Sequence, residues 1–254
     1  MDQDSSWLLI NSTVGIIMKC SNCLEQRSFL TESNGKILNC RSCGYSEPFH
    51  YPRYDQYHSK FYSYARVRTP KNDPLLQKIV ASMNIKKQHH VLDYGCGAGD
   101  YTAEFSKLSK HVIGVDINVD RASARFQTNT FKKQVGQKLE FRTHSIDRII
   151  CVNTIEHVKN FDRLVKEFYR VLKPGGKLFI TTYDTRFFLH KILFDETHVY
   201  EWDRPGFSKF IATYFTINQE FKTGIFFNYY PFNWMITKFL KPELCIVATK
   251  KPLQ

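Results

Sequence analysis

The sequence predicts an α/β protein whose mostly parallel sheet has helices on both faces, preceded by a small N-terminal module. Between residues 73 and 183, short apolar runs alternate with amphipathic segments, which is typical of parallel strands joined by helical crossovers. A turn with Gly95, Gly97 and Gly99 follows one of these runs, and such folds bind nucleotides at a turn of this kind. Two Cys-x2-Cys pairs near the N-terminus predict a separate metal-stabilised module.

The elements of the main domain are predicted from start, stop and periodicity signals. Asp73 and Pro74 suit the N-cap and the first position of a helix. Residues 184–222, rich in aromatic side chains, are expected to form a lid or insertion over the carboxyl ends of the strands. The remaining pattern predicts strands over 90–94, 111–116, 130–133, 147–152 and 177–182, helices over 101–108, 121–127 and 161–172, and a closing antiparallel pair over 224–229 and 243–250.

Composition and charge narrow the classes of protein that fit. The 254 residues are 43% hydrophobic, as in a folded globular chain, and no apolar run approaches the ~18 residues of a membrane span. Residues 1–17 lack the basic start of a signal peptide and are expected to be an extension that need not be ordered, so we expect a cytoplasmic protein. The net charge of +12 is compatible with nucleic acid, an anionic surface or a phosphorylated substrate, and equally with a lysine-rich solvated surface.

The first four cysteines predict a structural zinc site. Their two pairs are separated by sixteen residues, and four thiolates complete a closed, tetrahedral site. Short strands at 28–31 and 36–38 make residues 18–48 a zinc ribbon, followed by a tyrosine-rich linker and N-terminal helix at 49–72. Two disulfides are the alternative, which the missing signal peptide disfavours. The zinc either helps to recognise the substrate or stabilises the N-terminus, and its predicted ligands are Cys20, Cys23, Cys40 and Cys43.

The residues around the glycine turn predict the kind of cofactor. Asp116 follows the next apolar run, where an acid accepts hydrogen bonds from ribose hydroxyls; a strand-end cap is the structural alternative. The glycines are spaced Gly-x-Gly-x-Gly, which differs from the pattern of NAD enzymes, and Asp93 precedes them by two residues. An acid so close to the turn would repel a pyrophosphate, whereas it suits a cofactor with an amino group and a sulfonium.

Five segments resemble those of class I S-adenosylmethionine-dependent methyltransferases, in the same order and spacing. Residues 91–99 resemble motif I of that family, and residues 152–158 are similar to the leucine-glutamate-histidine-valine signature of its ubiquinone/menaquinone-type subgroup. The other resembling segments are 112–117, 141–150 and 170–176. The resemblance implies a Rossmann-like methyltransferase domain over residues 73–254, with a mostly parallel seven-stranded sheet, that binds S-adenosylmethionine.

The resemblance also implies roles for particular residues. The glycines would line the methionine part of the cofactor with Asp93 near its amino group, while Asp116 would hold the ribose and Ile117 pack on the adenine. Gln134 or Val135 stands where the family often has an acid beside the adenine, so that contact is in doubt here. The full set of expected cofactor residues is Asp93, Tyr94, Gly95, Cys96, Gly97, Gly99, Asp116, Ile117, Gln134, Val135 and Asn153.

The acceptor side is predicted from the segment after the fourth strand. A base is needed only if the acceptor carries a proton, and His157 is the first candidate, with a structural histidine as the alternative. Some quinone-type relatives bind a divalent metal here through acids and the histidine; Asn153 replaces one of the acids, so we expect no metal at this position. Weaker acceptor-side candidates are His144, Tyr183, His190 and His198.

The sequence therefore favours a methyltransferase that acts on an O, N or C atom of a small molecule, lipid or sugar-linked precursor. An RNA methyltransferase is the alternative, because a four-cysteine ribbon joined to this fold resembles large-subunit rRNA guanine methyltransferases and the net charge of +12 suits phosphate contacts. A non-catalytic zinc-ribbon binding protein is a third hypothesis, which the intact glycines and Asp116 disfavour.

Overall fold

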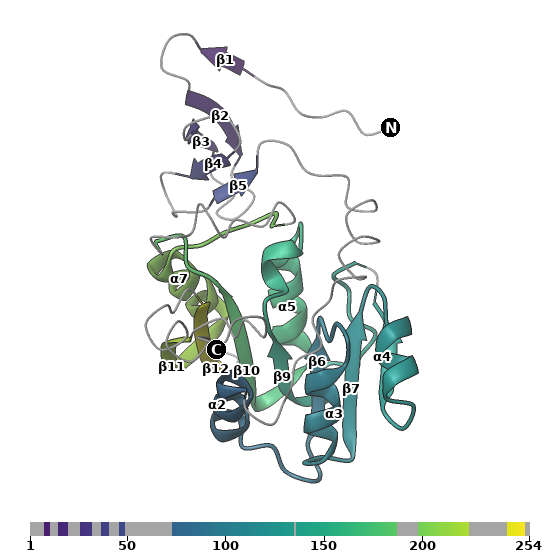
Figure 1. Cartoon of the computed structure of the whole chain (residues 1–254). Coiled ribbons are helices and arrows are strands. Elements are labelled where there is room, and N and C mark those ends of the chain that lie inside the picture. Colours follow the sequence, from purple (N-terminus) through teal and green to yellow (C-terminus); the bar gives the residue numbers. More distant parts are fainter. Residues whose placement is uncertain are drawn as a thin grey trace, which may run out of the picture.

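The structure is a computed structural model (Figure 1). It describes residues 73–134, 136–186, 198–223 and 243–251 with their side chains, and the backbone of five short strands within residues 8–48. In these parts of the chain, none of the helices is both long enough and apolar enough to cross a membrane.

A seven-stranded sheet forms the centre of the main domain, with the strand order β11-β12-β10-β9-β6-β7-β8. The pairs β10–β9, β9–β6, β6–β7 and β7–β8 are parallel, whereas β12 is antiparallel to both of its neighbours. The expectation of a mostly parallel sheet is thus confirmed. The strands are β6 His90–Tyr94, β7 His111–Asp116, β8 Thr130–Lys133, β9 Ile146–Cys151, β10 Leu172–Tyr183, β11 Phe215–Thr223 and β12 Glu243–Lys250.

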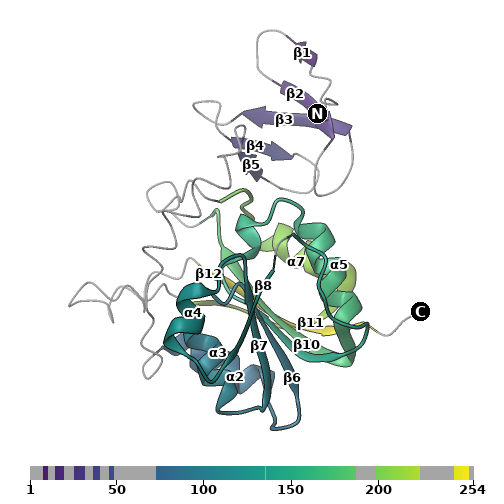
Figure 2. The ribbon, with the colours of Figure 1, turned by 90° about the vertical axis from the view of Figure 1, so that its right-hand side faces the viewer.

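Helices cover both faces of this sheet, as Figure 2 shows. Successive residues of a strand point to opposite faces, so in β6 Val91 packs with helices α2 and α3, while Leu92 packs with α5 and α7. At the start of α2, the Asp73 carboxylate accepts hydrogen bonds from the Leu75 and Leu76 amides, as predicted for an N-cap before Pro74. The helices are α2 Pro74–Met83, α3 Asp100–Ser106, α4 Asp120–Arg125, α5 Phe161–Val171 and α7 Arg204–Tyr214, with a 3-10 turn η2 at Ile155–His157.

The expectation of a lid over residues 184–222 is wrong for its second half. Residues 204–223 form helix α7 and strand β11, which pairs with β12 at the edge of the sheet. The aromatic side chains that suggested a lid are core residues instead, because Phe207 and Phe215 are fully buried. The strand expected at 224–229 lies outside the described residues, and β11 takes the place of that strand beside β12.

A second sheet lies within the first 48 residues and has the order β1-β2-β3-β4-β5. Its strands β3 Gln26–Thr31 and β4 Ile37–Cys40 pair antiparallel, as predicted for the hairpin between the two cysteine pairs. Cys20, Cys23 and Cys43 lie outside the described residues, as does the side chain of Cys40, so the zinc site stays a prediction. The remaining strands are β1 Leu8–Ile10, β2 Gly15–Lys19 and β5 Ser46–Pro48.

Candidate active site

The glycine turn joins the end of β6 to the start of α3 and lies close to β7 and to Thr154. Gly95, Gly97 and Gly99 all have positive φ, at 76°, 51° and 84°, a backbone conformation that glycine adopts without strain. The Gly95 and Cys96 amides donate to the Val115 carbonyl at 2.8 and 3.1 Å, which ties the turn to β7. A Cβ on Gly95 would lie 2.0 Å from Thr154 Oγ1, whereas a Cβ on Gly97 would have no described atom within 4 Å. The turn is therefore closed at Gly95 and open at Gly97.

Asp116 lies beside the open part of the turn. It is the last residue of β7, only 8% exposed, and its Oδ2 accepts a hydrogen bond from the Gly97 amide at 2.8 Å. Its backbone carbonyl accepts from the Gln134 amide at 2.7 Å, which extends the contact to the end of β8. The structure thus brings together the turn and the acid that the sequence assigns to the ribose.

Asp93 and Cys96 are buried next to the turn. The Thr102 hydroxyl, on α3, donates to Asp93 Oδ2 at 2.6 Å, so this carboxylate ties the end of β6 to the helix. Burial raises the pKa of the Cys96 thiol, and the nearby Asp93 and Asp116 raise it further. The Cys96 side chain is only 9% exposed and packs at the turn.

The adenine-side predictions have mixed outcomes. Ile117 is half-buried directly after Asp116, and Val135 lies outside the described residues. The Gln134 amide nitrogen donates to the Lys138 and Gly136 carbonyls, at 2.8 and 3.3 Å, and so holds the following loop. Asn153 has its side chain on β10 and β12: Nδ2 donates to Glu243 Oε1, and Oδ1 accepts from the Thr181 hydroxyl, both at 2.7 Å. Asn153 is thus engaged away from the glycine turn.

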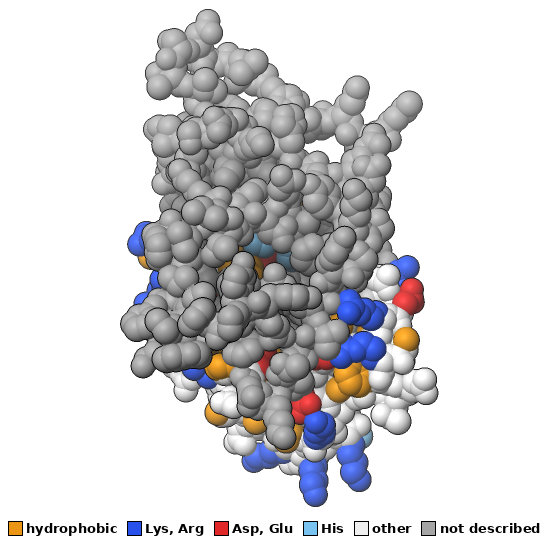
Figure 3. All heavy atoms as spheres, in the orientation of Figure 1, with side chains coloured by type: hydrophobic (Ala, Val, Ile, Leu, Met, Phe, Trp, Pro, Cys, Tyr) orange, Lys and Arg blue, Asp and Glu red, His pale blue; other side chains and the backbone are white. Residues whose placement is uncertain are grey.

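A second group of polar side chains gathers at the carboxyl ends of β9 and β10. Glu156 and His157 belong to η2, and the Glu156 carbonyl accepts from the Val199 and Tyr200 amides at 2.8 and 3.0 Å. These two backbone bonds hold His198 against the turn, so that its ring centroid lies 5.0 Å from that of His157. Figure 3 shows histidine (pale blue) and acidic (red) side chains close together at one point on the face that it draws.

The electrostatics of this group are unusual. Glu156 is fully buried, and neither of its carboxyl oxygens has a hydrogen-bond partner among the described residues. Burial raises the pKa of Glu156 to about 7, and the proximity of His198 acts in the opposite direction. His198 is itself 4% exposed, and its Nδ1 lies 3.1 Å from Glu201 Oε1.

Of the weaker acceptor-side candidates, the structure brings two into this group. Tyr183, at the end of β10, stacks on His198 with ring centroids 5.2 Å apart. His144 lies before the first residue of β9 and therefore at the opposite edge of the sheet, and its side chain is exposed. It is not part of this group. His190 lies outside the described residues.

Comparison with known proteins assigns a family to the segment that carries the glycine turn and part of the second group. The family model described as "Methyltransferase domain" matches residues 92–180, from the middle of β6 to β10. Residues 92–180 form a methyltransferase domain. The matched range contains the glycine turn, Asp116 and the Glu156-His157 pair.

Two curated relatives and one solved structure show what this domain is similar to. A ubiquinone biosynthesis O-methyltransferase of Coxiella burnetii is 33% identical over 123 residues, which cover 45% of this chain and 52% of the relative. Phosphoethanolamine N-methyltransferase 1 of Arabidopsis thaliana is 32% identical over 117 residues, 42% of this chain and 23% of the relative. The YcgJ protein of Bacillus subtilis superposes with a TM-score of 0.56 over 70% of this chain and 98% of its own, at 20% identity.

These matches cover only part of this chain and only part of the curated relatives. The chain spans about half or less of the length of the curated relatives it matches. The structural likeness shows that the fold is the Rossmann-like class I methyltransferase fold, which confirms the fold expected from the sequence motifs. The five-stranded N-terminal sheet lies outside the residues that the family model matches.

The structure also places around both groups site residues that sequence reasoning missed. Arg125, on α4, donates to the Ala98 carbonyl at 2.8 Å and to both oxygens of Asp100 at 2.6 and 3.0 Å, so it clamps the end of the glycine turn. Glu201 fixes His198, and Thr154 closes the turn at Gly95. Of these three residues, only Arg125 could have been suggested by the sequence, because it is a basic residue that follows the acidic Asp100. Pairs of this kind are too common for this one to be chosen from the sequence.

Proposed function

We propose that this chain transfers the methyl group of S-adenosylmethionine to a small-molecule acceptor. The observation that carries the proposal is the open part of the glycine turn at Gly97, with the Asp116 carboxylate 2.8 Å from the Gly97 amide. A ligand that enters there meets backbone amides and an acid in a part of the fold that binds nucleosides. The family match over residues 92–180 supports the same cofactor.

The residues around the turn divide the work of holding the cofactor. Asp116 would release the Gly97 amide and accept hydrogen bonds from the ribose hydroxyls of the cofactor. Asp93 would stabilise the end of β6 beside the amino group of the cofactor. Arg125 keeps the turn in place through Ala98 and Asp100. Because the donor is already activated as a sulfonium, the main task of the site is to align the acceptor with the methyl group and to exclude water.

The acceptor side is the group around His157 and His198. Its position at the carboxyl ends of β9 and β10 places it at the same edge of the sheet as the turn, since Thr154 touches Gly95 and begins the chain into η2. Two buried acids and two histidines suit an acceptor whose hydroxyl or amino group loses a proton on methylation. The curated relatives methylate an oxygen in ubiquinone biosynthesis and a nitrogen in phosphoethanolamine, by their names, which supports a small molecule of either kind.

Cofactor binding is tested by isothermal titration with S-adenosylmethionine. Asp116→Ala should weaken binding roughly 100-fold, because two hydrogen bonds to a charged group contribute about 3 kcal/mol. Asp147→Asn, which neutralises an aspartate at the other edge of the sheet, serves as the matched control and should bind as the wild type does. Equal affinity of Asp116→Ala and the wild type would refute the site.

The acceptor class is tested by transfer of a tritiated methyl group. Purified protein is incubated with labelled S-adenosylmethionine and either a small-molecule extract or total RNA, with Asp116→Ala as the blank. Label in the small-molecule fraction supports the proposal. Label in RNA alone would replace it with the RNA methyltransferase alternative.

We also propose that Cys20, Cys23, Cys40 and Cys43 hold one structural zinc in a ribbon over residues 18–48. The spacing of the two pairs and the antiparallel pairing of β3 with β4 between them support this assignment. Cys40→Ser should lower the zinc content by about one ion per chain in elemental analysis and release the ribbon from its fold. An unchanged zinc content in this variant would exclude the ribbon.

A further inference from the structure

Glu156 is a buried acid, and the described groups that act on its carboxyl, His198 and the Thr182 hydroxyl, leave it without a hydrogen bond of ordinary geometry. Its side chain is completely inaccessible to solvent, and both carboxyl oxygens are without hydrogen-bond partners among the described residues. A buried carboxylate needs a cation or several donors to offset its lost hydration. One ligand-type atom each from Glu156, His157 and His198 lie within 4.8 Å of one another. Two imidazoles therefore lie close to the carboxyl group of Glu156.

We propose that Glu156, His157 and His198 bind a divalent transition-metal ion, with Glu201 orienting His198. This inference reverses the expectation that the replacement of an acid by Asn153 excludes a metal. Asn153 turns to Thr181 and Glu243, and the third ligand comes from His198, beyond β10. One ligand of this donor set, His198, lies outside the residues 92–180 that match the methyltransferase family.

The separations and the donors fit such an ion. A tetrahedral metal with bonds of about 2.0–2.1 Å needs ligand atoms roughly 3.4 Å apart, so atoms that lie within 4.8 Å of one another have to approach by up to about 1.4 Å when the ion binds. Two imidazoles and one carboxylate suit zinc, cobalt, nickel or ferrous iron, whereas magnesium prefers oxygen ligands in an octahedron. The proposal is accordingly a nitrogen-rich site that discriminates against magnesium.

Glu201 supplies the outer contact that metal-binding histidines usually have. Its Oε1 lies 3.1 Å from His198 Nδ1, and it is 6% exposed. A carboxylate that accepts the Nδ1 proton fixes the tautomer and makes Nε2 the ligand nitrogen. The stacked ring of Tyr183 and the two amide bonds to the Glu156 carbonyl hold His198 in place before any ion arrives.

This site would give the proposed function a means of acting on the acceptor. The inference rests on the proposed function only for this role: a bound metal lowers the pKa of a hydroxyl that coordinates it. His157 is then a ligand and not the base.

The experiment measures metal binding alone, on the full-length chain without S-adenosylmethionine. Protein stripped with a chelator is dialysed against zinc, and the zinc content and affinity are determined. His198→Asn should bind about one ion per chain fewer than the wild type, whatever the cysteines bind. The matched control is His144→Asn, an exposed histidine whose positive φ asparagine tolerates; it should lose none.

Two further variants and one competitor complete the test. Glu201→Gln should keep the stoichiometry but weaken zinc binding at least ~10-fold, as loss of an outer-shell partner does. His157→Asn, at a half-exposed position, should lose the same ion and replaces His198→Asn if that variant does not fold. Millimolar magnesium should not displace the zinc. The proposal is overturned if folded variants at 157 and 198 retain the wild-type zinc content.

The outcome is independent of the proposed function. His198→Asn should bind S-adenosylmethionine within about twofold of the wild type, because the glycine turn and Asp116 are untouched. Loss of zinc with intact cofactor binding supports both proposals, and zinc binding by a chain that fails to bind S-adenosylmethionine would sink only the proposed function.

Discussion

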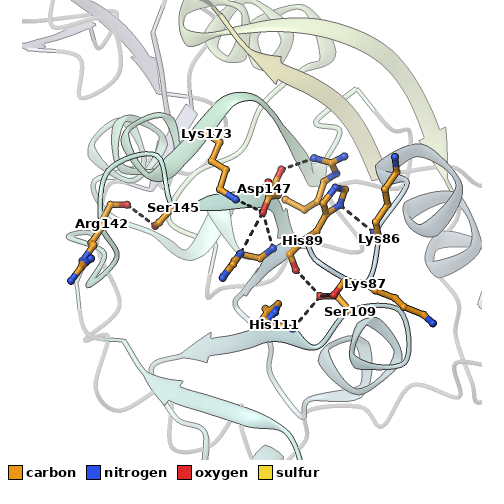
Figure 4. Close-up of polar contacts among 11 residues, drawn as sticks. Lys86, Lys87, His89, Ser109, His111, Arg142, Ser145, Asp147 and Lys173 are labelled. Carbon is orange, nitrogen blue, oxygen red and sulfur yellow. Dashed lines mark hydrogen bonds and ion pairs between the residues drawn. The ribbon is translucent and has the colours of Figure 1, made fainter.

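The two edges of the central sheet use polar side chains in opposite ways. At the amino edge, shown in Figure 4, Asp147 Oδ2 accepts from the His90 amide and from Lys173 Nζ, both at 2.8 Å. Ser109 there donates to the His89 carbonyl at 2.6 Å and accepts from the His111 amide at 3.1 Å. At the carboxyl edge, neither carboxyl oxygen of Glu156 has such a partner among the described residues.

This difference separates groups that hold the fold from groups that await a ligand. The amino edge satisfies its buried and half-buried polar atoms from within the chain, so a change there should lower stability and leave binding alone. The carboxyl edge retains a buried acid without such hydrogen bonds, and a group of this kind in a native structure calls for an explanation such as a ligand. Measurements of stability and ligand binding in variants of both edges test this contrast.

The largest effect is expected at Gly95. In Gly95→Ala the new Cβ would lie 2.0 Å from Thr154 Oγ1 at a φ of 76°, so the turn must move. We expect a loss of about 3 kcal/mol or more in the free energy of unfolding, measured in urea, together with loss of S-adenosylmethionine binding. Gly136→Ala is the control, because it has a φ of 77° but no described neighbour within 4 Å, and should lose only about 1 kcal/mol. Equal losses in the two variants would mean that backbone conformation alone, and not the contact with Thr154, constrains the turn.

An intermediate effect with opposite signs is expected for the two edges. In metal-free protein, Glu156→Gln should raise the free energy of unfolding by about 1–2 kcal/mol, because it removes an unpaired buried charge. The new amide can donate to Thr182 Oγ1, which already acts on the Glu156 carboxyl but makes no hydrogen bond of ordinary geometry among the described residues. Asp147→Asn should lower it by about 1 kcal/mol, since the ion pair with Lys173 is lost. Destabilisation by both variants would show that Glu156 is structurally satisfied and would remove the contrast between the edges.

The sequence predicts most of what depends on local signals. Strands β6 and β7 have the expected bounds, since apolar runs end at Tyr94 and Asp116 and the next residues are turn formers. The cap at Asp73 and the meeting of Asp116 with the glycine turn follow from residue chemistry and strand order. Parallel strands bring their carboxyl ends to one edge, so these contacts need no knowledge of side-chain packing.

What the sequence could not predict depends on contacts between distant segments. The aromatic residues at 207 and 215 are buried against the sheet, and composition alone does not distinguish a core helix from a lid. His198 meets Glu156 only because two backbone amides that follow it bond to the Glu156 carbonyl. Asn153 was assigned to the cofactor from its place after β9, but its left-handed φ of 46° accompanies a side chain bonded to β10 and β12.

The smallest effect is expected for the ion pair between Arg170 and Glu167, which belongs neither to the glycine turn nor to the group around His157 and His198. Arg170 binds Glu167 through two contacts of 2.7 Å and also donates to the Phe141 and Leu139 carbonyls, so the pair secures the chain that leads into β9. The hydrogen bonds from Arg170 lower the pKa of Glu167 below its ordinary 4.5, burial opposes them, and the Leu139 amide adds to the lowering. A carboxyl whose pKa is depressed in the folded state stabilises the fold above its unfolded pKa, and this contribution is lost as the pH falls through the folded value.

Glu167→Gln should therefore lower the free energy of unfolding by about 0.5–1 kcal/mol at pH 7, and the difference from wild type should shrink below about pH 4.5. Glu104→Gln removes a more exposed pair with Lys107 and should change stability by less. If the difference at Glu167 persisted unchanged at pH 3, its contribution would come from packing and not from the charge on its carboxylate.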